Sequence, residues 1–253
     1  MAEHQVVEGD LLTVLPTLGV FDFIYADPPY GISHLSRPID FGKMGVYQVP
    51  PDTSYDTFAS EEDYTRFTCK WVRWVASCLS PGGSVVVSTT HHHLDTLLSE
   101  LKGCGLKHLH NIVWLKTNAI PNMSAKLLMH THEYLLWFSK GGGWYMDYHW
   151  LKSWNGGKQC RDVVSFPMTS ESERVRVDGK MICRAQKPSA LMEWIARGFT
   201  RPGSRLLEAF GGVGSFAVAV KNVGERSCVV VEKDPTRAAI IRGRLDPGGG
   251  EIG

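Results

Sequence analysis

Four consecutive residues near the N-terminus, Asp27-Pro28-Pro29-Tyr30, follow the apolar, strand-like stretch FDFIYA. Two prolines in a row cannot continue a helix and are poor residues for a central strand, so the backbone there is stiff and extended. A carboxylate and an aromatic ring are therefore held at fixed positions where a buried strand ends. A simple turn with a solvated aspartate fits the same four residues, and this stretch alone does not decide between the two interpretations.

A second informative stretch, SRLLEAFGGVGSFAVAVKNVGERSCVVVEKDP, spans residues 204–235. A buried strand is predicted to end at Glu208, glycines follow at 211, 212 and 214, and a helix begins at Ser215. Glycines let the backbone turn sharply against a ligand, and a helix N-terminus offers free N–H groups. The next strand ends at Glu232, eighteen residues after Gly214, where a carboxylate can accept hydrogen bonds from both hydroxyls of a ribose.

The glycine stretch admits two kinds of cofactor. Residues 212–217 match G-x-G-x-x-G/A, a pattern of dinucleotide-binding proteins. Only about forty residues follow the loop, too few for the rest of a domain that binds NAD. Glu208 adds an acid that can reach an amino group, which suits a cofactor with an amino-acid part. The strand acid, the glycine bend and the ribose acid together favour S-adenosylmethionine.

Histidines and cysteines give no indication of a metal site. His91, His92 and His93 begin a predicted helix and point in different directions, so we expect no metal there. We interpret His132 and Glu133 as a structural pair rather than a catalytic one. The six cysteines are far apart and contain no C-x-x-C pair, which predicts reduced thiols in a cytoplasmic protein without structural zinc.

Strand-like and helix-like stretches alternate along the chain. The strand candidates are QVVEG, FDFIYA, GGSVVVSTT, HNIVWLK, EYLLWFSK, RLLEAF and SCVVVEK, and the helix candidates are EEDYTRFTCKWVRWVASCL, HLDTLLSELKGCG, KPSALMEWIARGF and SFAVAVKNVG. Several strands are almost wholly apolar, as in sheets covered on both faces. The sequence therefore predicts an α/β fold, a mostly parallel twisted sheet with helices on both faces. Two long stretches, 34–58 and 140–187, do not fit this alternation and are expected to be functional.

Charge is unevenly distributed, although the whole chain has a net charge of +1. Residues 1–101 carry −8, residues 102–187 carry +7 and residues 188–253 carry +2. Within 140–187, nine Lys/Arg and five acids are interleaved with aromatic residues, a composition that suits phosphate contacts and base stacking. An ordinary additional hairpin is the alternative. No run of about 18 apolar residues is present, which predicts that the chain has no membrane span, and we see no signal peptide.

Taken together, the order of these motifs resembles the β-class amino-methyltransferases of DNA. Those enzymes are circularly permuted, with a D-P-P-Y motif first, a target-recognition segment in the middle and an F-x-G-x-G loop last. The resemblance covers roughly residues 5–246 and includes VEGDLLTVLPTL, SPGGSVVV, IVWLKTNAIPN, HEYLLWFSKG and SERVRVDGKMICRAQKPSALMEWIARGF. The chain departs from the family's D-P-F-x-G-S-G-T, since it has Glu208-Ala209-Phe210-Gly211-Gly212-Val213-Gly214-Ser215.

The resemblance implies a Rossmann-like, circularly permuted fold of S-adenosylmethionine-dependent methyltransferases with a small target-recognition insertion. It divides the chain into a catalytic half at 1–139, a target-recognition segment at 140–187, a cofactor-binding half of the same domain at 188–246 and a flexible tail at 247–253.

Roles for individual residues follow from the same resemblance. The catalytic residues are Asp27, Pro28, Pro29 and Tyr30, with Asp27 and the Pro28 carbonyl accepting hydrogen bonds from an exocyclic amine and Tyr30 stacking on the base. The expected cofactor-binding residues are Asp10, Asp27, Lys187, Glu208, Phe210, Gly211, Gly212, Gly214, Ser215 and Glu232. Lys187 would lie near the cofactor's carboxylate, or be a solvated lysine at a helix start.

The expected reaction is methyl transfer from S-adenosylmethionine to the N6 amine of an adenine flipped out of double-stranded DNA at a specific sequence. Aspartate in D-P-P-Y favours adenine over cytosine within the family. Three alternatives stay open: cytosine N4 as acceptor, RNA or a protein amide as acceptor, and a non-catalytic DNA-binding protein. A homodimer and a restriction endonuclease partner are also open, and no metal is expected.

Overall fold

The computed structural model describes residues 3–32, 39–40, 46–47, 56–121 and 126–246. The predicted tail at 247–253 and most of the stretch 34–58 lie outside these residues. The strands are β1 (His4–Glu8), β2 (Phe21–Ala26), β3 (Ile39–Asp40), β4 (Val46–Tyr47), β5 (Leu79–Thr89), β6 (Lys107–Lys116), β7 (His132–Ser139), β8 (Val163–Phe166), β9 (Arg176–Val177), β10 (Lys180–Met181), β11 (Arg205–Glu208) and β12 (Ser227–Glu232). The helices are α1 (Leu11–Val14), the short 3-10 helix η1 (Leu15–Thr17), α2 (Glu61–Cys78), α3 (Leu94–Gly103), α4 (Tyr148–Trp154), α5 (Ser189–Phe199), α6 (Ser215–Val223) and α7 (Pro235–Leu245).

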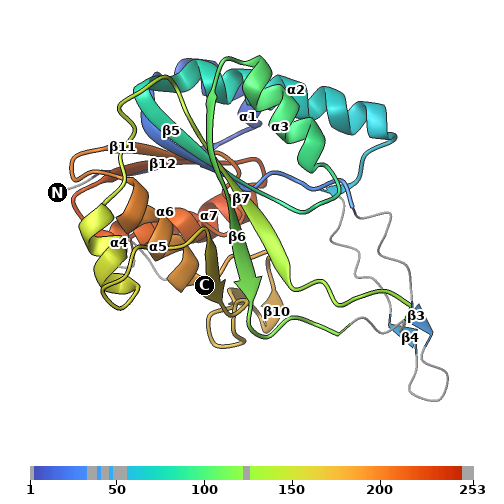
Figure 1. Cartoon of the computed structure of the whole chain (residues 1–253). Helices are drawn as coiled ribbons and strands as arrows, with labels where there is room; N and C mark the ends of the chain where they lie inside the picture. Colours follow the sequence, from blue (N-terminus) through green and yellow to red (C-terminus); the bar gives the residue numbers. More distant parts are fainter. Residues whose placement is uncertain (1–2, 33–38, 41–45, 48–55, 122–125, 247–253) are drawn as a thin grey trace.

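Within the described residues, eight strands form one sheet in the order β1-β12-β11-β2-β5-β7-β6-β8 (Figure 1). All neighbours are parallel except that β7 runs antiparallel to both β5 and β6. This confirms the mostly parallel α/β fold predicted from the sequence. β1, from the N-terminal half, pairs with β12 from the C-terminal half, so the two predicted halves share one sheet.

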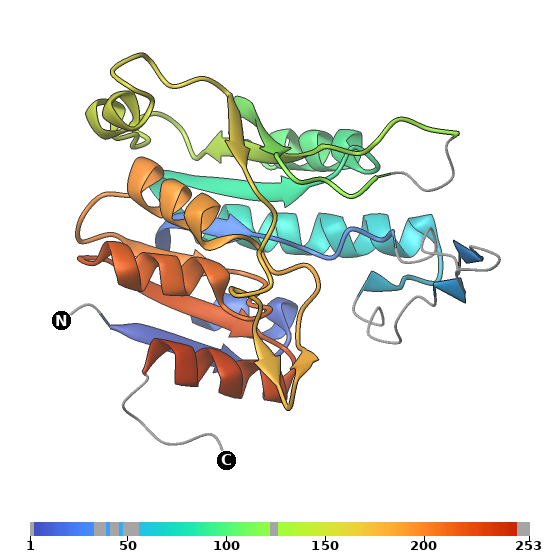
Figure 2. The ribbon, with the colours of Figure 1, turned by 90° about the horizontal axis from the view of Figure 1, so that it is seen from below.

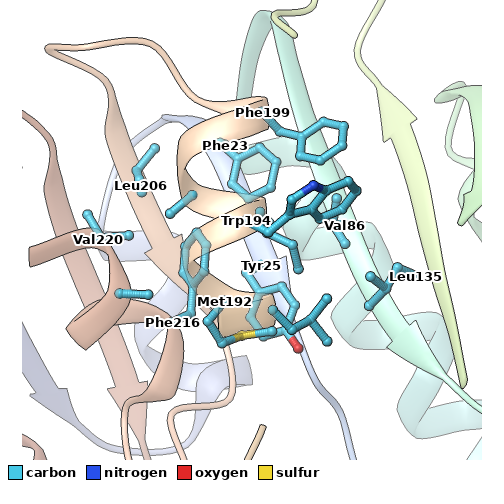
Figure 3. Close-up of a cluster of buried hydrophobic side chains, with 14 of the residues drawn as sticks. Phe23, Tyr25, Val86, Leu135, Met192, Trp194, Phe199, Leu206, Phe216 and Val220 are labelled. Atoms are coloured by element: carbon cyan, nitrogen blue, oxygen red, sulfur yellow. The ribbon is translucent and has the colours of Figure 1, made fainter. Parts of the chain in front are cut away.

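Alternating side chains of the central strand β2 face two separate hydrophobic clusters. Phe23 and Tyr25 pack with residues of α5, α6 and α7, whereas Ile24 and Ala26 pack with residues of α1, α2 and α3. Figure 3 shows the first cluster, in which Trp194 and Phe216 lie against the strands. Helices therefore cover both faces, which explains why the strands are apolar on both sides.

Helix α2 shows how local sequence sets an element's ends and its buried face. The Ser60 side chain accepts a hydrogen bond from the backbone N–H of Asp63, which caps the helix N-terminus. Trp71 is buried, as its helical spacing predicts, but Trp74 is 39% exposed and lies outside the core.

The direction of the strands defines two edges of the sheet with different roles. Strands β2, β11 and β12 end at one edge, which we call the site edge, and β7 begins there because it runs in the opposite direction. Figure 2 shows α4, in yellow-green, at the opposite end of the molecule from β3, β4 and the connection between β6 and β7. Side chains that follow the parallel strands therefore meet at the site edge.

Candidate active site

The chain that leaves β2 is held in place by buried contacts. Asp56, only 8% exposed, accepts hydrogen bonds from the backbone N–H groups of Gly31 and Ile32, at 2.7 and 3.1 Å. Gly31 has a φ of +67°, and a Cβ on it would lie 2.6 Å from the ring of Tyr64. Both observations explain a glycine here, since an L side chain would meet strain and a collision. Asp27 to Tyr30 are consequently fixed at the site edge.

Asp27 is the acceptor for a lysine and a tyrosine. The Nζ of Lys187 lies 2.8 Å from Oδ1 and 2.7 Å from Oδ2 of Asp27. The hydroxyl of Tyr30 donates to Oδ1 of Asp27 at 2.8 Å. A carboxylate offers about four acceptor positions, and these contacts use three of them, two on Oδ1 and one on Oδ2. Oδ2 therefore retains a position for a further donor.

Glu133, the second residue of β7, joins this group from the other side. Its Oε2 lies 3.2 Å from the Tyr30 hydroxyl and 3.5 Å from Nζ of Lys187. Its Oε1 forms a 2.7 Å ion pair with Nζ of Lys116, at the end of β6. Two carboxylates and two ammonium groups thus form one cluster of balanced charge, and the side chains of Lys187 and Glu133 are 6% and 12% exposed.

The pKa values in this cluster are shifted by burial and by the neighbouring charges. Burial raises the pKa of Asp27, and the ammonium of Lys187 opposes that shift. Burial alone would lower the pKa of Lys187, but Asp27 and Glu133 outweigh it and raise that pKa. For Glu133, burial acts to raise the pKa, but Lys187 and Lys116 prevail and lower it. Lys187 and Glu133 are therefore charged at neutral pH.

Two expectations from the sequence need correction here. Lys187 is not a solvated residue at a helix start, because it is buried and paired with Asp27. Glu133 is not a structural partner of His132, since its carboxylate contacts Tyr30, Lys116 and Lys187. Sequence reasoning missed Lys116 as well. Recognising Glu133 requires knowing that β7 is antiparallel and so begins at the site edge, and Lys116 belongs to the cluster through its ion pair with Glu133.

The glycine loop connects β11 to α6 at the same edge. Gly212 and Gly214 have φ values of +55° and +73°, which L side chains rarely adopt. A Cβ on Gly211 would lie 2.7 Å from Val230, and one on Gly214 would lie 2.9 Å from Ile241 of α7. Backbone conformation and close packing therefore both require glycines here. Ser215 is the first residue of α6, as predicted.

The two acids that flank the loop are already hydrogen-bonded to backbone N–H groups. Glu208 is buried and accepts from Phe216 and Ala217, at 3.0 and 2.9 Å, and burial raises its pKa to about 8. Glu232 accepts from Gly212 at 2.6 Å and from Asp234 at 2.8 Å. Glu208 thus caps the first turn of α6, a contact that the sequence did not predict, and Glu232 fixes the bend of the loop.

Two further predicted residues lie at the rim of this region. Asp10 caps α1 by accepting from the Leu12 N–H at 2.9 Å, and it forms a 3.1 Å ion pair with Lys233. Phe210 packs edge-on against Trp71, with ring centroids 5.5 Å apart. Both are accessible enough to contact a ligand, since Asp10 has a 42% exposed side chain and Phe210 is only partly buried.

The loop and the charged cluster are neighbours. β11 pairs directly with β2, and the backbone N–H of Ala209 donates to the carbonyl of Tyr25 at 2.9 Å. Cys183, a buried residue of the segment that leads to Lys187, bridges the two regions. A Cβ on Gly212 would lie 3.7 Å from its Sγ, and the charges of Asp27 and Lys187 both affect its pKa, which burial raises.

The stretch 140–187 divides between the two edges of the sheet. Its first part, with α4, lies opposite the site edge, and a surface cavity of about 420 Å³ is lined there by residues that include Trp154 and Arg161. Trp154 stacks on Phe166 with centroids 5.7 Å apart, so this aromatic ring packs against the protein. Only the part after β8, which ends opposite Lys116, is at the site edge.

The described residues contain no group of three or more His, Cys, Asp or Glu side chains placed to hold a metal ion. Their six cysteines are free thiols. In the described part of the chain, no helix is long and apolar enough to cross a membrane.

A mostly parallel α/β sheet with Asp27 at one strand end, beside a glycine loop and the strand-end acid Glu232, is typical of enzymes that bind a nucleotide cofactor. Comparison with known proteins gives the same result. The family model described as DNA methylase matches residues 21–242. The chain belongs to this family, which confirms the prediction of an S-adenosylmethionine-dependent DNA methyltransferase.

Two curated relatives are similar over most of their length. The type II methyltransferase M2.DpnII of Streptococcus pneumoniae is 33% identical over 229 residues, 89% of this chain and 82% of the relative. M2.LlaDCHI of Lactococcus lactis subsp. cremoris is 32% identical over 231 residues, with shares of 90% and 82%. These identities extend the family assignment beyond the isolated motifs.

Solved structures share the fold at lower identity. The complex of M1.HpyAVI with SAM has a TM-score of 0.71 and 20% identity, covering 96% of this chain and 99% of that chain. The PvuII DNA methyltransferase, described as cytosine-N4-specific, has a TM-score of 0.73 and 16% identity, with coverage of 99% and 89%.

Proposed function

We propose that this methyltransferase acts on the N6 amine of an adenine that is flipped out of duplex DNA at a specific sequence. The observation that carries the proposal is the arrangement at Asp27, which has a free acceptor position on Oδ2 next to the glycine loop. Aspartate in the D-P-P-Y motif supports adenine, by resemblance within the family. A base inside a duplex cannot reach a strand-end carboxylate, so the target must leave the stack.

The residues around the loop fit S-adenosylmethionine. The bend at Gly212 and Gly214, where φ is positive, would present the loop backbone to the cofactor, and Glu232 at the end of β12 would accept from ribose hydroxyls. Phe210 and Asp10 would border the adenine, and Glu208 would act indirectly, since it is buried and caps the first turn of α6. This cofactor supplies an electrophilic methyl group on a sulfonium.

Asp27 and the Pro28 carbonyl would accept the two N–H groups of the target amine and so orient its lone pair. An exocyclic amine is hardly basic, because its lone pair is delocalised into the ring, so orientation contributes more than a strong base would. After transfer, the methylated amine carries a surplus proton, and Asp27 can receive it because burial raises its pKa. Lys187 and Tyr30 hold the carboxylate in place, and the Tyr30 ring would stack on the base.

We propose further that target recognition within 140–187 is concentrated in residues 167–187, the part that lies at the site edge. The hairpin of β9 and β10 and Arg174 and Arg184 belong to this part. Four further points stay predictions from the resemblance and the composition: binding of double-stranded DNA, a homodimer, an endonuclease partner and a cytoplasmic location.

The test is transfer of labelled methyl from S-adenosylmethionine to unmethylated DNA of mixed sequence, followed by nucleoside analysis and mapping of the modified site. N6-methyladenine is the expected product. N4-methylcytosine would instead identify cytosine as the base that accepts the methyl group. Asp27→Asn should abolish transfer while calorimetry still shows cofactor binding. Asp22→Asn is the matched control, because Asp22 lies on the same strand at the opposite edge, bonded to Ser80 and Arg205.

A further inference from the structure

The connection between β6 and β7 carries the most exposed large apolar side chains of the described residues. Leu128 is 94% exposed, Leu127 is 76% exposed and Ile120 is 72% exposed. Single exposed apolar residues are common, but three in one connection, two of them adjacent in sequence, indicate a contact with another molecule. We call the described residues of this connection, 117–121 and 126–131, the hairpin tip.

The hairpin tip is anchored firmly at its base. The backbone N–H of Lys116 donates to the carbonyl of Thr131 at 2.7 Å, which joins the two arms. The side chain of Asn118 accepts from the backbone N–H of Met168 at 2.7 Å. Below these bonds, Lys116 and Glu133 form the ion pair that belongs to the cluster around Asp27. The tip therefore projects from a fixed base beside the candidate catalytic carboxylate, past the ends of the parallel strands (Figures 1 and 2).

The charge of the hairpin tip suits a polyanion. The sequence of the hairpin tip contains no acid and includes Lys126 and His130, and His132 follows it directly. The ring of His130 stacks on His91, with centroids 4.3 Å apart, so a second polar segment borders the tip. Lysine and histidine side chains next to the exposed Leu127 and Leu128 suit a nucleic acid duplex. Its phosphates attract the polar groups, and its stacked bases offer an apolar surface.

We propose that Leu127 and Leu128 enter the DNA duplex as an apolar wedge beside the target adenine and fill the gap that the flipped base leaves. Apolar wedges of this kind separate base steps in other DNA-binding proteins. A second copy of the chain is a poorer occupant, because three side chains offer far less than the roughly 1,000 Å² that a stable interface needs. The inference rests on the proposed flipping of an adenine.

The experiment uses the sequence mapped with the wild-type enzyme, in two short duplexes. In one the target adenine is paired with thymine, and in the other it faces an abasic position, so that extrusion costs little. The test variant is Leu127→Ala/Leu128→Ala, and Leu127→Met/Leu128→Met keeps the apolar bulk. Val20→Ala is the matched control, since Val20 is 58% exposed just before β2, away from the site edge.

For the alanine variant we expect transfer to the paired duplex to fall about tenfold or more, and transfer to the abasic duplex to change less than about threefold. The methionine variant and Val20→Ala should behave as wild type on both. Three outcomes would each overturn the proposed wedge. They are equal losses of transfer on both duplexes, no loss on the paired duplex, and a change in the sedimentation of the protein that parallels the loss. Absence of adenine methylation by the wild type would instead refute the proposed function.

Discussion

Replacing Glu133 by glutamine tests whether the charged cluster around Asp27 acts as one unit. The substitution keeps the shape of the side chain and removes one of two carboxylates that face a buried and a partly buried lysine, Lys187 and Lys116. At the 2.7 Å separation of Lys116 and Glu133, an effective dielectric constant of about 20 gives an attraction of roughly 6 kcal/mol. Desolvation of the carboxylate offsets part of this, and removing one partner of a buried pair costs about 3–5 kcal/mol.

We take the lower value, about 3 kcal/mol, because glutamine still accepts a hydrogen bond from Lys116. For a chain of this size each kcal/mol lowers Tm by about 2–4 °C, so Tm should fall by roughly 6–12 °C. The kcat for methyl transfer should fall about tenfold, since Lys187 would then pair with Asp27 alone and make it a weaker acceptor for the amine. KM for DNA should stay within about twofold, because Glu133 lies behind Asp27.

Thermal unfolding and transfer of labelled methyl measure the two effects. Glu62→Gln is the control, since Glu62 has an 85% exposed side chain on α2 and forms an ion pair along the helix with Arg66. In the double variant Lys116→Met/Glu133→Gln the unpaired charge is gone, so its Tm should fall by clearly less than the two single losses combined. Strictly additive losses, or a Glu133→Gln variant no less stable than Glu62→Gln, would refute the reasoning.

Three further predictions concern the glycine loop, its acid and the DNA. Gly214→Ala should lower the free energy of unfolding by about 1–3 kcal/mol in denaturant titrations, since φ is +73° and the new Cβ would meet Ile241 at 2.9 Å; a smaller loss would show that α7 moves aside. The folded state raises the pKa of Glu208 to about 8, so the unfolded chain releases this proton first, and Tm should fall as pH rises from about 5 to 8. In Glu208→Gln that part of the slope should vanish, and an unchanged slope would assign it to other groups. DNA affinity should fall steeply between about 50 and 200 mM salt in binding titrations, and a flat response would count against phosphate contacts.

The motifs at the strand ends were readable from local sequence because each has a local physical cause. Consecutive prolines after FDFIYA stop a strand and leave Asp27 at its end, wherever that strand lies in the sheet. The glycines before Ser215 predict a bend and a helix start, and the apolar strands predict a sheet covered on both faces. These features, with the order of the motifs, were enough to predict the fold class and the family.

Tertiary structure alone decided which side chains surround Asp27. Lys187 is 160 residues away along the chain, and nothing in its local sequence distinguishes a buried partner from a solvated helix-start lysine. Glu133 reaches the cluster only because β7 runs antiparallel between β5 and β6, so that it begins where the others end, and Lys116 joins the cluster through its ion pair with Glu133. Strand direction depends on long-range pairing, which local residue patterns do not encode. For the same reason the sequence did not predict that the first part of 140–187 lies at the far edge of the sheet, whereas the base of the hairpin tip adjoins the cluster around Asp27.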